Sequence, residues 1–373
     1  MNKSEITEIK KLFTPRNCSI TRICGCYVDG EKNKKTEFKQ AFLALPEEEM
    51  YKYFELLRKN FSGTLNKNLL NLEFSLSSEG EGTAHEFLLK LRDSRLKDDA
   101  LLTEFYDKII NSYEYIGNYL ILIIHDAYDV PKLTTDGVTN EDASEEVYDY
   151  IMACICPVNL SKAGLSYDAT GNSFRTRIRD WVVDMPEFGF IFPAFNDRST
   201  DIHALMVYEK NPELNYDSLV DELIGCELPL SAGTQKDVFR SLISETLGND
   251  CGFTQVKQIH EQIQELVEEH SEDALPLILD KEEVKDIFEK SGVSDEKMSV
   301  FDERYENNAG EDATLSVNNI VNTRSFDVKT PDVTIKVKPE RTDLLSTKEI
   351  DGRKCLVIAL DGEVEINGIS VRP

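Results

Sequence analysis

The sequence lacks the short motifs by which many enzymes and nucleotide-binding proteins are identified. It contains no Gly-x-Gly-x-x-Gly, no Gly-Lys-Ser/Thr, no Gly-x-Ser-x-Gly and no His-Glu-x-x-His. The single tryptophan, Trp181, excludes a stacking platform of several tryptophans, and we expect it to anchor the core beside Val182 and Val183. We therefore assign no catalytic residue, and the sequence does not decide between an enzyme and a non-enzymatic protein.

Long apolar stretches are also missing. The longest strongly apolar run, residues 119–124, is far shorter than the roughly 20 residues that a membrane-spanning helix needs. Residues 1–13 have the pattern of a short amphipathic helix and lack the apolar core of a signal peptide. We expect no membrane association and a cytoplasmic location.

Positive charge is scarce in this chain. It has 42 Lys and Arg against 69 Asp and Glu, for a net charge of −27, and such a surface repels phosphate backbones. Two predicted helices at residues 281–290 and 295–305 resemble a helix-turn-helix in outline, but both are net acidic. Direct DNA binding is therefore not expected, and the charge favours a protein partner with a basic surface.

The cysteine pattern argues against disulfides and against a zinc site. Eight cysteines in 373 residues, several in apolar runs, indicate reduced thiols in a cytoplasmic protein. Cys24–Cys26 and Cys154–Cys156 are two Cys-x-Cys pairs, and four thiolates would suit zinc. However, residues i and i+2 of a straight strand lie nearly 7 Å apart. We predict no metal and no cofactor, while the sequence leaves open whether the two pairs meet in space.

The apolar periodicity predicts an α+β fold in three parts. Residues 1–212 are expected to form a mixed β-sheet flanked by helices, and residues 213–308 an acidic helical segment. Residues 309–373 are expected to form a C-terminal antiparallel β-meander, because three Asp-Gly or Asn-Gly dipeptides punctuate short apolar runs. The clearest strands are predicted at residues 20–28, 69–76, 119–124, 152–158, 333–337, 354–360, 363–366 and 369–371.

An arginine-striped segment leads into a long predicted hairpin at residues 188–208. If residues 175–183 form a strand, Arg175, Arg177 and Arg179 point to one face about 7 Å apart. Guanidinium groups suit phosphate and carboxylate, so these three and Arg198 at the hairpin tip form a candidate anion-binding site. Alternatively, the arginines form cross-strand ion pairs with the chain's own carboxylates.

Titratable residues gather at the hairpin tip and at the end of a predicted central strand. Asp197, Asp201 and His203 are a hypothetical acid–base or metal-binding group at the tip. His125 and Asp126 directly follow the apolar run at residues 119–124, where α/β sites often assemble. The alternative is that these side chains satisfy turns, cap helices or are solvated.

Three segments resemble a known family. They are TRICGCYVDGEKNKK at residues 21–35, FIFPAFNDRSTDIHALMVY at residues 190–208 and the tail IDGRKCLVIALDGEVEINGI. The chain resembles, along nearly its whole length, a family of uncharacterised cytoplasmic proteins from anaerobic Gram-positive bacteria, described as a domain of unknown function. The resemblance implies a bacterial cytosolic protein and transfers no catalytic residue, substrate or cofactor.

Three classes of function are consistent with these observations. The net charge and the missing motifs favour a non-enzymatic cytosolic interaction or regulatory protein with a strongly acidic surface. The alternative is an enzyme or sensor for a small phosphorylated ligand, held by the arginine stripe and the hairpin tip. A further alternative is a ribosome- or RNA-associated factor that docks through the arginine stripe.

Overall fold

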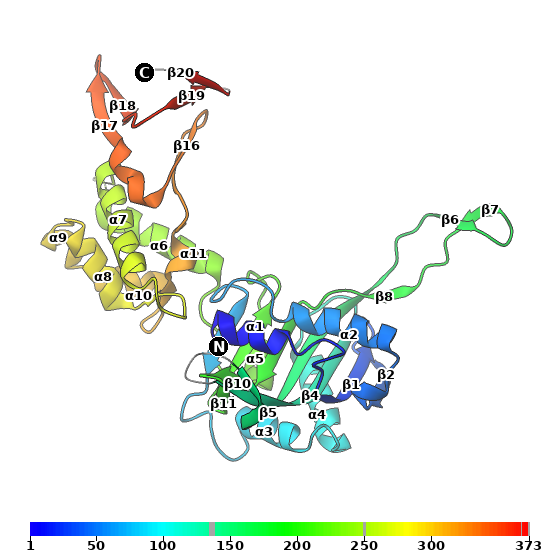
Figure 1. The fold of residues 1–373 in the computed structure, drawn as a ribbon. Helices are drawn as coiled ribbons and strands as arrows, with labels where there is room; N and C mark the ends of the chain where they lie inside the picture. Colours follow the sequence, from blue (N-terminus) through cyan, green and yellow to red (C-terminus); the bar gives the residue numbers. More distant parts are fainter. Residues whose placement is uncertain (134–138, 249–250, 367, 372–373) are drawn as a thin grey trace. The chain divides into compact units, whose positions relative to one another are not determined.

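An eight-stranded antiparallel sheet dominates the first of two units in the computed structural model, which describes residues 1–133, 139–248, 251–366 and 368–371 (Figure 1). The strand order is β2-β1-β4-β5-β9-β12-β3, and β8 pairs with β5 beside this path. The strands are β1 (Ile20–Val28), β2 (Lys34–Gln40), β3 (Leu69–Glu73), β4 (Asn118–Leu133), β5 (Thr139–Leu160), β8 (Trp181–Val183), β9 (Phe188–Phe192) and β12 (Ala204–Glu209). The α+β class is confirmed, but every described pair in this sheet is antiparallel rather than mixed.

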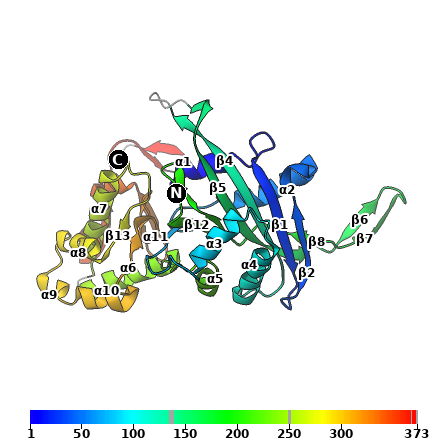
Figure 2. The same ribbon diagram turned by 90° about the horizontal axis from the view of Figure 1, so that it is seen from below.

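Each face of this sheet carries its own hydrophobic core. Successive side chains of a strand point to opposite faces, so Ile121 and Ile123 of β4 join one core and Leu122 and Ile124 join the other. Helices α3 (Ala84–Asp93), α4 (Asp99–Ser112) and α5 (Asp217–Leu223) cover the first face (Figure 2). Helices α1 (Lys3–Lys10) and α2 (Glu47–Lys59) and the 3-10 turn η1 (Phe42–Ala44) cover the second. The continuous apolar run in β4 is thus buried on both sides, as its sequence predicts.

Local signals in the sequence explain where these helices begin. Asn2 caps α1 and forms a capping box with Glu5, and the Asp98 side chain accepts hydrogen bonds from the first turn of α4. Three glutamates in the first turn of α2 follow Pro46, which suits the positive end of the helix dipole. These caps satisfy backbone N–H groups that have no partner inside the helix.

The second unit, residues 229–373, is built around a helical core of its own. Its helices are α6 (Ala232–Leu247), α7 (Phe253–Glu269), α8 (Lys281–Lys290), α9 (Asp295–Met298), α10 (Phe301–Ala309) and α11 (Val317–Ile320), with a short pair of strands β13 (Ile278–Leu279) and β14 (Leu315–Ser316). The predicted helix at residues 295–305 is divided into α9 and α10. Gly248 ends α6 with a positive φ of 55°, as its place after the apolar stripe predicts.

The C-terminal strands of this unit are present where they were predicted, but they pair as separate hairpins. The hairpins are β15 (Phe326–Lys329) with β16 (Thr334–Val337), β17 (Leu345–Ile350) with β18 (Arg353–Ile358), and β19 (Val364–Ile366) with β20 (Ile369–Val371). A 3-10 segment, η3 (Pro339–Leu344), separates the first two. The predicted antiparallel strands are therefore confirmed, but in the described residues they form three separate two-stranded sheets rather than one continuous meander. Across the described ranges, no helix is long and apolar enough to span a membrane.

Candidate functional site

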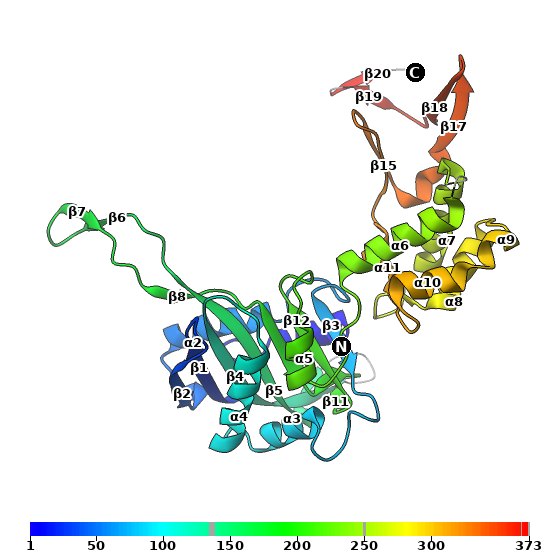
Figure 3. The same cartoon turned by 180° about the vertical axis from the view of Figure 1, so that it is seen from behind.

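The chain leaves the sheet at the end of β5 and forms a projecting hairpin before it returns in β8. This arm, residues 161–180, contains β6 (Leu165–Asp168) and β7 (Ser173–Thr176), which pair with each other and with no other described strand. Figures 1 and 3 show the arm extending away from the helices that cover the sheet. None of its side chains belongs to either core of the first unit.

The two strands of the arm form an amphipathic ribbon. Leu165 lies opposite Thr176 and Tyr167 lies opposite Phe174, so these four side chains share one face. Three of them are apolar and strongly exposed, with 76% for Leu165, 58% for Tyr167 and 73% for Phe174. The Tyr167 and Phe174 rings contact each other at a centroid distance of 5.7 Å. The opposite face carries only polar side chains, namely Ser166, Asp168, Ser173 and Arg175.

The arginine stripe lies on this arm, but it is not one strand. Strand β7 ends at Thr176 and residues 177–180 have no regular structure, so the predicted continuous strand at residues 175–183 is wrong. The ladder breaks here because the chain passes from pairing with β6 to pairing with β5. Arg175 lies 3.7 Å from Asp168, and Nε of Arg179 donates to the carbonyl of Ser161 at 2.7 Å.

The base of the arm carries further exposed apolar side chains. Trp181 is 56% exposed, and Val182 and Val183 are also exposed, so the prediction that Trp181 anchors the core is wrong. The reason is its position, because among the described strands β8 pairs only with the last residues of β5, 158–160. Leu160 beside it is exposed as well.

The predicted hairpin tip lies at the other end of the first unit, away from the arm (Figures 1 and 3). It consists of β10 (Ala194–Asn196) and β11 (Ser199–Asp201), joined by Asp197 and Arg198 with φ of 51° and 57°. Arg198 donates to both carboxylate oxygens of Glu8 at 3.0 and 2.9 Å and to the carbonyl of Pro131 at 2.9 Å. The structure therefore does not bring Arg198 together with the three arginines of the arm.

Asp201 and His203 are held in local hydrogen bonds. The Asn196 side chain donates to Oδ2 of Asp201 at 2.7 Å, and the backbone N–H of His203 donates to Oδ1 of the same carboxylate. Nδ1 of His203 lies 2.7 Å from Oε1 of Glu79, and this hydrogen bond raises the pKa of the imidazole. Among the described residues, no group of three or more His, Cys, Asp and Glu side chains is arranged to hold a metal ion.

His125 and Asp126 point to opposite faces of the sheet and cannot share a site. Nε2 of the buried His125 lies 2.5 Å from Oδ1 of Asp149, and its Nδ1 lies 2.7 Å from Oγ1 of Thr21. Because a carboxylate only accepts, Nε2 carries the proton in this pair. Burial alone would raise the pKa of Asp149, but the contact with His125 and the nearby Arg95 lower it. A hydrogen-bonded chain thus links β1, β4 and β5.

Asp126 lies in the other core, beside Tyr150. Burial raises the pKa of its carboxyl, and the Tyr150 hydroxyl donates to Oδ2 of Asp126 at 2.7 Å. Sequence reasoning identified His125 and Asp126 but missed Thr21, Asp149 and Tyr150. Thr21 contacts His125 because a β-bulge between Ile20 and Arg22 places it there, and no local sequence signal marks that bulge.

The two Cys-x-Cys pairs are also separated by the sheet. Cys24 and Cys26 lie in the core on the α3–α4 face, whereas Cys154 and Cys156 lie in the core on the α1–α2 face. The sulfur atoms of Cys154 and Cys156 are 3.8 Å apart. The four thiols therefore do not converge on one point.

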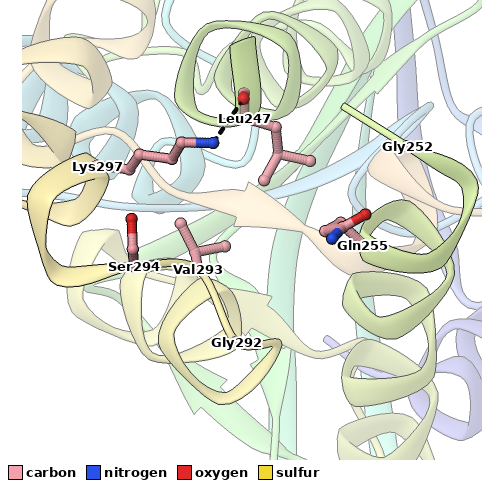
Figure 4. A pocket seen from close by; sticks show the side chains of 7 residues that line it. All are labelled: Leu247, Gly252, Gln255, Gly292, Val293, Ser294 and Lys297. Carbon is pink, nitrogen blue, oxygen red and sulfur yellow. Dashed lines mark hydrogen bonds between the residues drawn. The ribbon is translucent and has the colours of Figure 1, made fainter. Parts of the chain in front are cut away.

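The second unit contains a small open cavity lined by both polar and apolar residues. Figure 4 shows its lining, which is Leu247, Gly252, Gln255, Gly292, Val293, Ser294 and Lys297 around a volume of about 340 Å³. Nζ of Lys297 donates to the carbonyl of Leu247 at 2.8 Å. None of the site residues predicted from the sequence lies in this cavity.

The comparisons with known proteins define the family but not an activity. A family model described as a domain of unknown function, DUF4317, matches residues 1–369. The chain belongs to this family, which confirms the resemblance to a domain of unknown function that the sequence motifs indicate. The comparisons with curated proteins and with solved structures gave no match.

Proposed function

We propose that this chain is a non-enzymatic interaction protein that docks on a partner protein through its arm. The observation that supports the proposal is the amphipathic ribbon, with Leu165, Tyr167 and Phe174 exposed on one face. An isolated two-stranded hairpin is only marginally stable in water, and an exposed contiguous apolar face is typical of an interaction surface. Covering these side chains would contribute roughly 1.5–3 kcal/mol each before the cost of association.

The composition of the arm favours a protein over a nucleic acid as its target. Residues 161–180 contain four basic side chains and two acidic ones, a net charge of +2 in a chain of −27. Nucleic-acid binders usually neutralise several phosphates, and a phosphate backbone would leave the apolar face uncovered. Tyrosine, tryptophan and arginine are the residue types that dominate binding at protein interfaces. The ribosome or RNA alternative therefore has less support.

The net charge bears on the rest of the chain rather than on the arm. The residues outside 161–180 carry 38 basic and 67 acidic side chains, a net charge of −29. The prediction of a basic partner applies to that acidic remainder. Because the arm itself carries a charge of +2, the charge gives no reason to expect that the protein contacting the arm is basic. Anion binding by Arg175, Arg177 and Arg179 remains a prediction, and so does the cytoplasmic location.

Affinity purification from native cytosol tests the proposal. The bait is the full chain, compared with the triple variant L165T/Y167T/F174T, which removes the apolar face but keeps residues suited to strands. The matched control is S166T/S173T on the opposite face of the same ribbon. We expect wild type and the control to capture the same proteins, and the triple variant to lose at least one of them. Identical capture by all three baits, together with an equal mass of all three chains in solution, would refute the proposal.

A further inference from the structure

The face of the arm that carries Leu165, Tyr167 and Phe174 is self-complementary, which suggests what covers it. We infer that the partner of this face is the same face of a second copy of the chain, packed across a two-fold axis. This inference rests on the proposed docking role of the arm. In an isologous contact of this kind, one surface patch contacts its own copy, so no separate complementary site is required.

The chemistry of the two faces fits this arrangement. Packing the apolar faces together buries Leu165, Tyr167, Phe174 and the methyl group of Thr176, and it buries no charged side chain of the ribbon. Arg175 and Asp168 lie on the opposite face and remain in water with their 3.7 Å contact. Two ribbons packed in this way form a four-stranded sandwich, which resolves the marginal stability of a single hairpin.

The area available agrees with a weak dimer. Leu165, Tyr167 and Phe174 are exposed by 76, 58 and 73%. With roughly 150–250 Å² for each aromatic side chain and somewhat less for the leucine, two copies offer about 600–850 Å². That area is below the roughly 1,200 Å² at which stable specific interfaces begin, so we expect a weak, transient dimer with a dissociation constant well above the micromolar range.

The salt dependence of binding distinguishes a second copy of the chain from a basic partner protein. Two chains of −27 repel each other at long range, and the two arms of +2 that form the contact also repel each other. Salt screens this repulsion, since the Debye length is about 10 Å at 0.1 M. The dimer should therefore tighten as salt rises, whereas a complex between the acidic remainder and a basic partner should weaken.

The first experiment measures the mass of the purified full chain in solution by light scattering across a concentration series, at low and moderate salt. We expect wild type and S166T/S173T to approach twice the mass of the 42.4 kDa chain at high concentration. The variant L165T/Y167T/F174T should need at least tenfold more protein to do so. Since the arm belongs to neither core, circular dichroism should show all three chains equally folded.

A mixing experiment distinguishes arm-to-arm contact from other dimers. Tagged wild type is mixed with untagged wild type or with untagged L165T/Y167T/F174T. A contact between two arms requires both apolar faces, so the tagged chain should retain only untagged wild type. Retention of the variant would show that the arm binds elsewhere on the second copy and would overturn the inference.

Failure of the inference and failure of the proposed function give different results. A monomeric wild type whose arm captures another protein from cytosol would overturn the second-copy inference and leave the docking role intact. A dimer that persists in the triple variant would also overturn it. If the triple variant neither changes the mass nor loses a captured protein, the docking role of the arm fails as well.

Discussion

The carboxyl of Glu209 should make the first unit less stable as pH rises, and Glu209→Gln should remove that loss. Glu209 is the last residue of β12 and only 4% exposed. Burial, with a smaller contribution from Asp217, raises its pKa from the ordinary value of 4.5 to about 7. Its Oε1 atom has no hydrogen-bond partner among the described residues. The charged form is therefore disfavoured in the folded state.

The sign and size follow from proton linkage. Between pH 4.5 and about 7 the unfolded chain loses this proton while the folded chain keeps it, so the free energy of unfolding falls as pH rises. At about 1.4 kcal/mol per pH unit, the difference between the folded and unfolded pKa values lowers the free energy of unfolding by about 3 kcal/mol. This loss is complete above about pH 7. Because Gln cannot ionise, Glu209→Gln should be more stable than wild type by about 2–3 kcal/mol at pH 8 and by less than about 1 kcal/mol at pH 5.

Guanidinium unfolding of the full chain at both pH values measures this difference. Near-UV circular dichroism reports mainly the first unit, because Tyr305 is the only one of the 14 tyrosines that lies after residue 228. Glu227→Gln, at an exposed carboxylate, is the control and should change stability little at either pH. Equal effects of Glu209→Gln at pH 5 and pH 8, or a loss of stability at pH 8, would refute the reasoning.

Three further predictions concern the sheet and the arm. His125→Ala should lower the free energy of unfolding of the first unit by about 2–4 kcal/mol, because it removes the hydrogen bonds to Thr21 of β1 and to the carboxylate of Asp149 in β5. An unchanged denaturation midpoint would contradict this role. Gly189→Ala should cost at least about 1–3 kcal/mol, because a Cβ there would come within 2.7 Å of the Ala153 carbonyl oxygen. Gly80→Ala, where a Cβ meets nothing within 4 Å, is its control, and equal thermal midpoints for the two variants would refute the clash. Replacing residues 161–180 with a short Gly-Ser linker should leave the thermal midpoint unchanged, and a drop of several degrees would show that the arm packs on the sheet.

Local sequence signals account for most of the helices and strands but not for how these elements pair and pack. The continuous apolar run at residues 119–124 predicts a strand buried on both faces, and Pro46 with three glutamates predicts the start of α2. The C-terminal turn dipeptides correctly mark Asp351 and Gly352, which have φ of 51° and 74°. They do not say whether neighbouring hairpins join, because that depends on contacts beyond each turn.

The arm shows why apolar composition alone misleads. The apolar sequence pattern at Trp181, Val182 and Val183 is the same for a strand that packs on a core and for a strand that is exposed to solvent. Only the pairing of β8 with the end of β5 places these residues outside the cores. The contact between Thr21 and His125 was equally hidden, because 104 residues separate them and a register shift brings them together.

The sheet separates two pairs of buried thiols, one pair on each face. Each pair can therefore report on the local unfolding of the helices that cover its face. Cys24 and Cys26 are fully covered from one side, and Cys154 and Cys156 from the other. A thiol reagent can modify each pair only when local unfolding of the helices that pack over that pair uncovers it. The order in which the two pairs react would therefore show which layer opens first in the unmutated protein, without any attached probe.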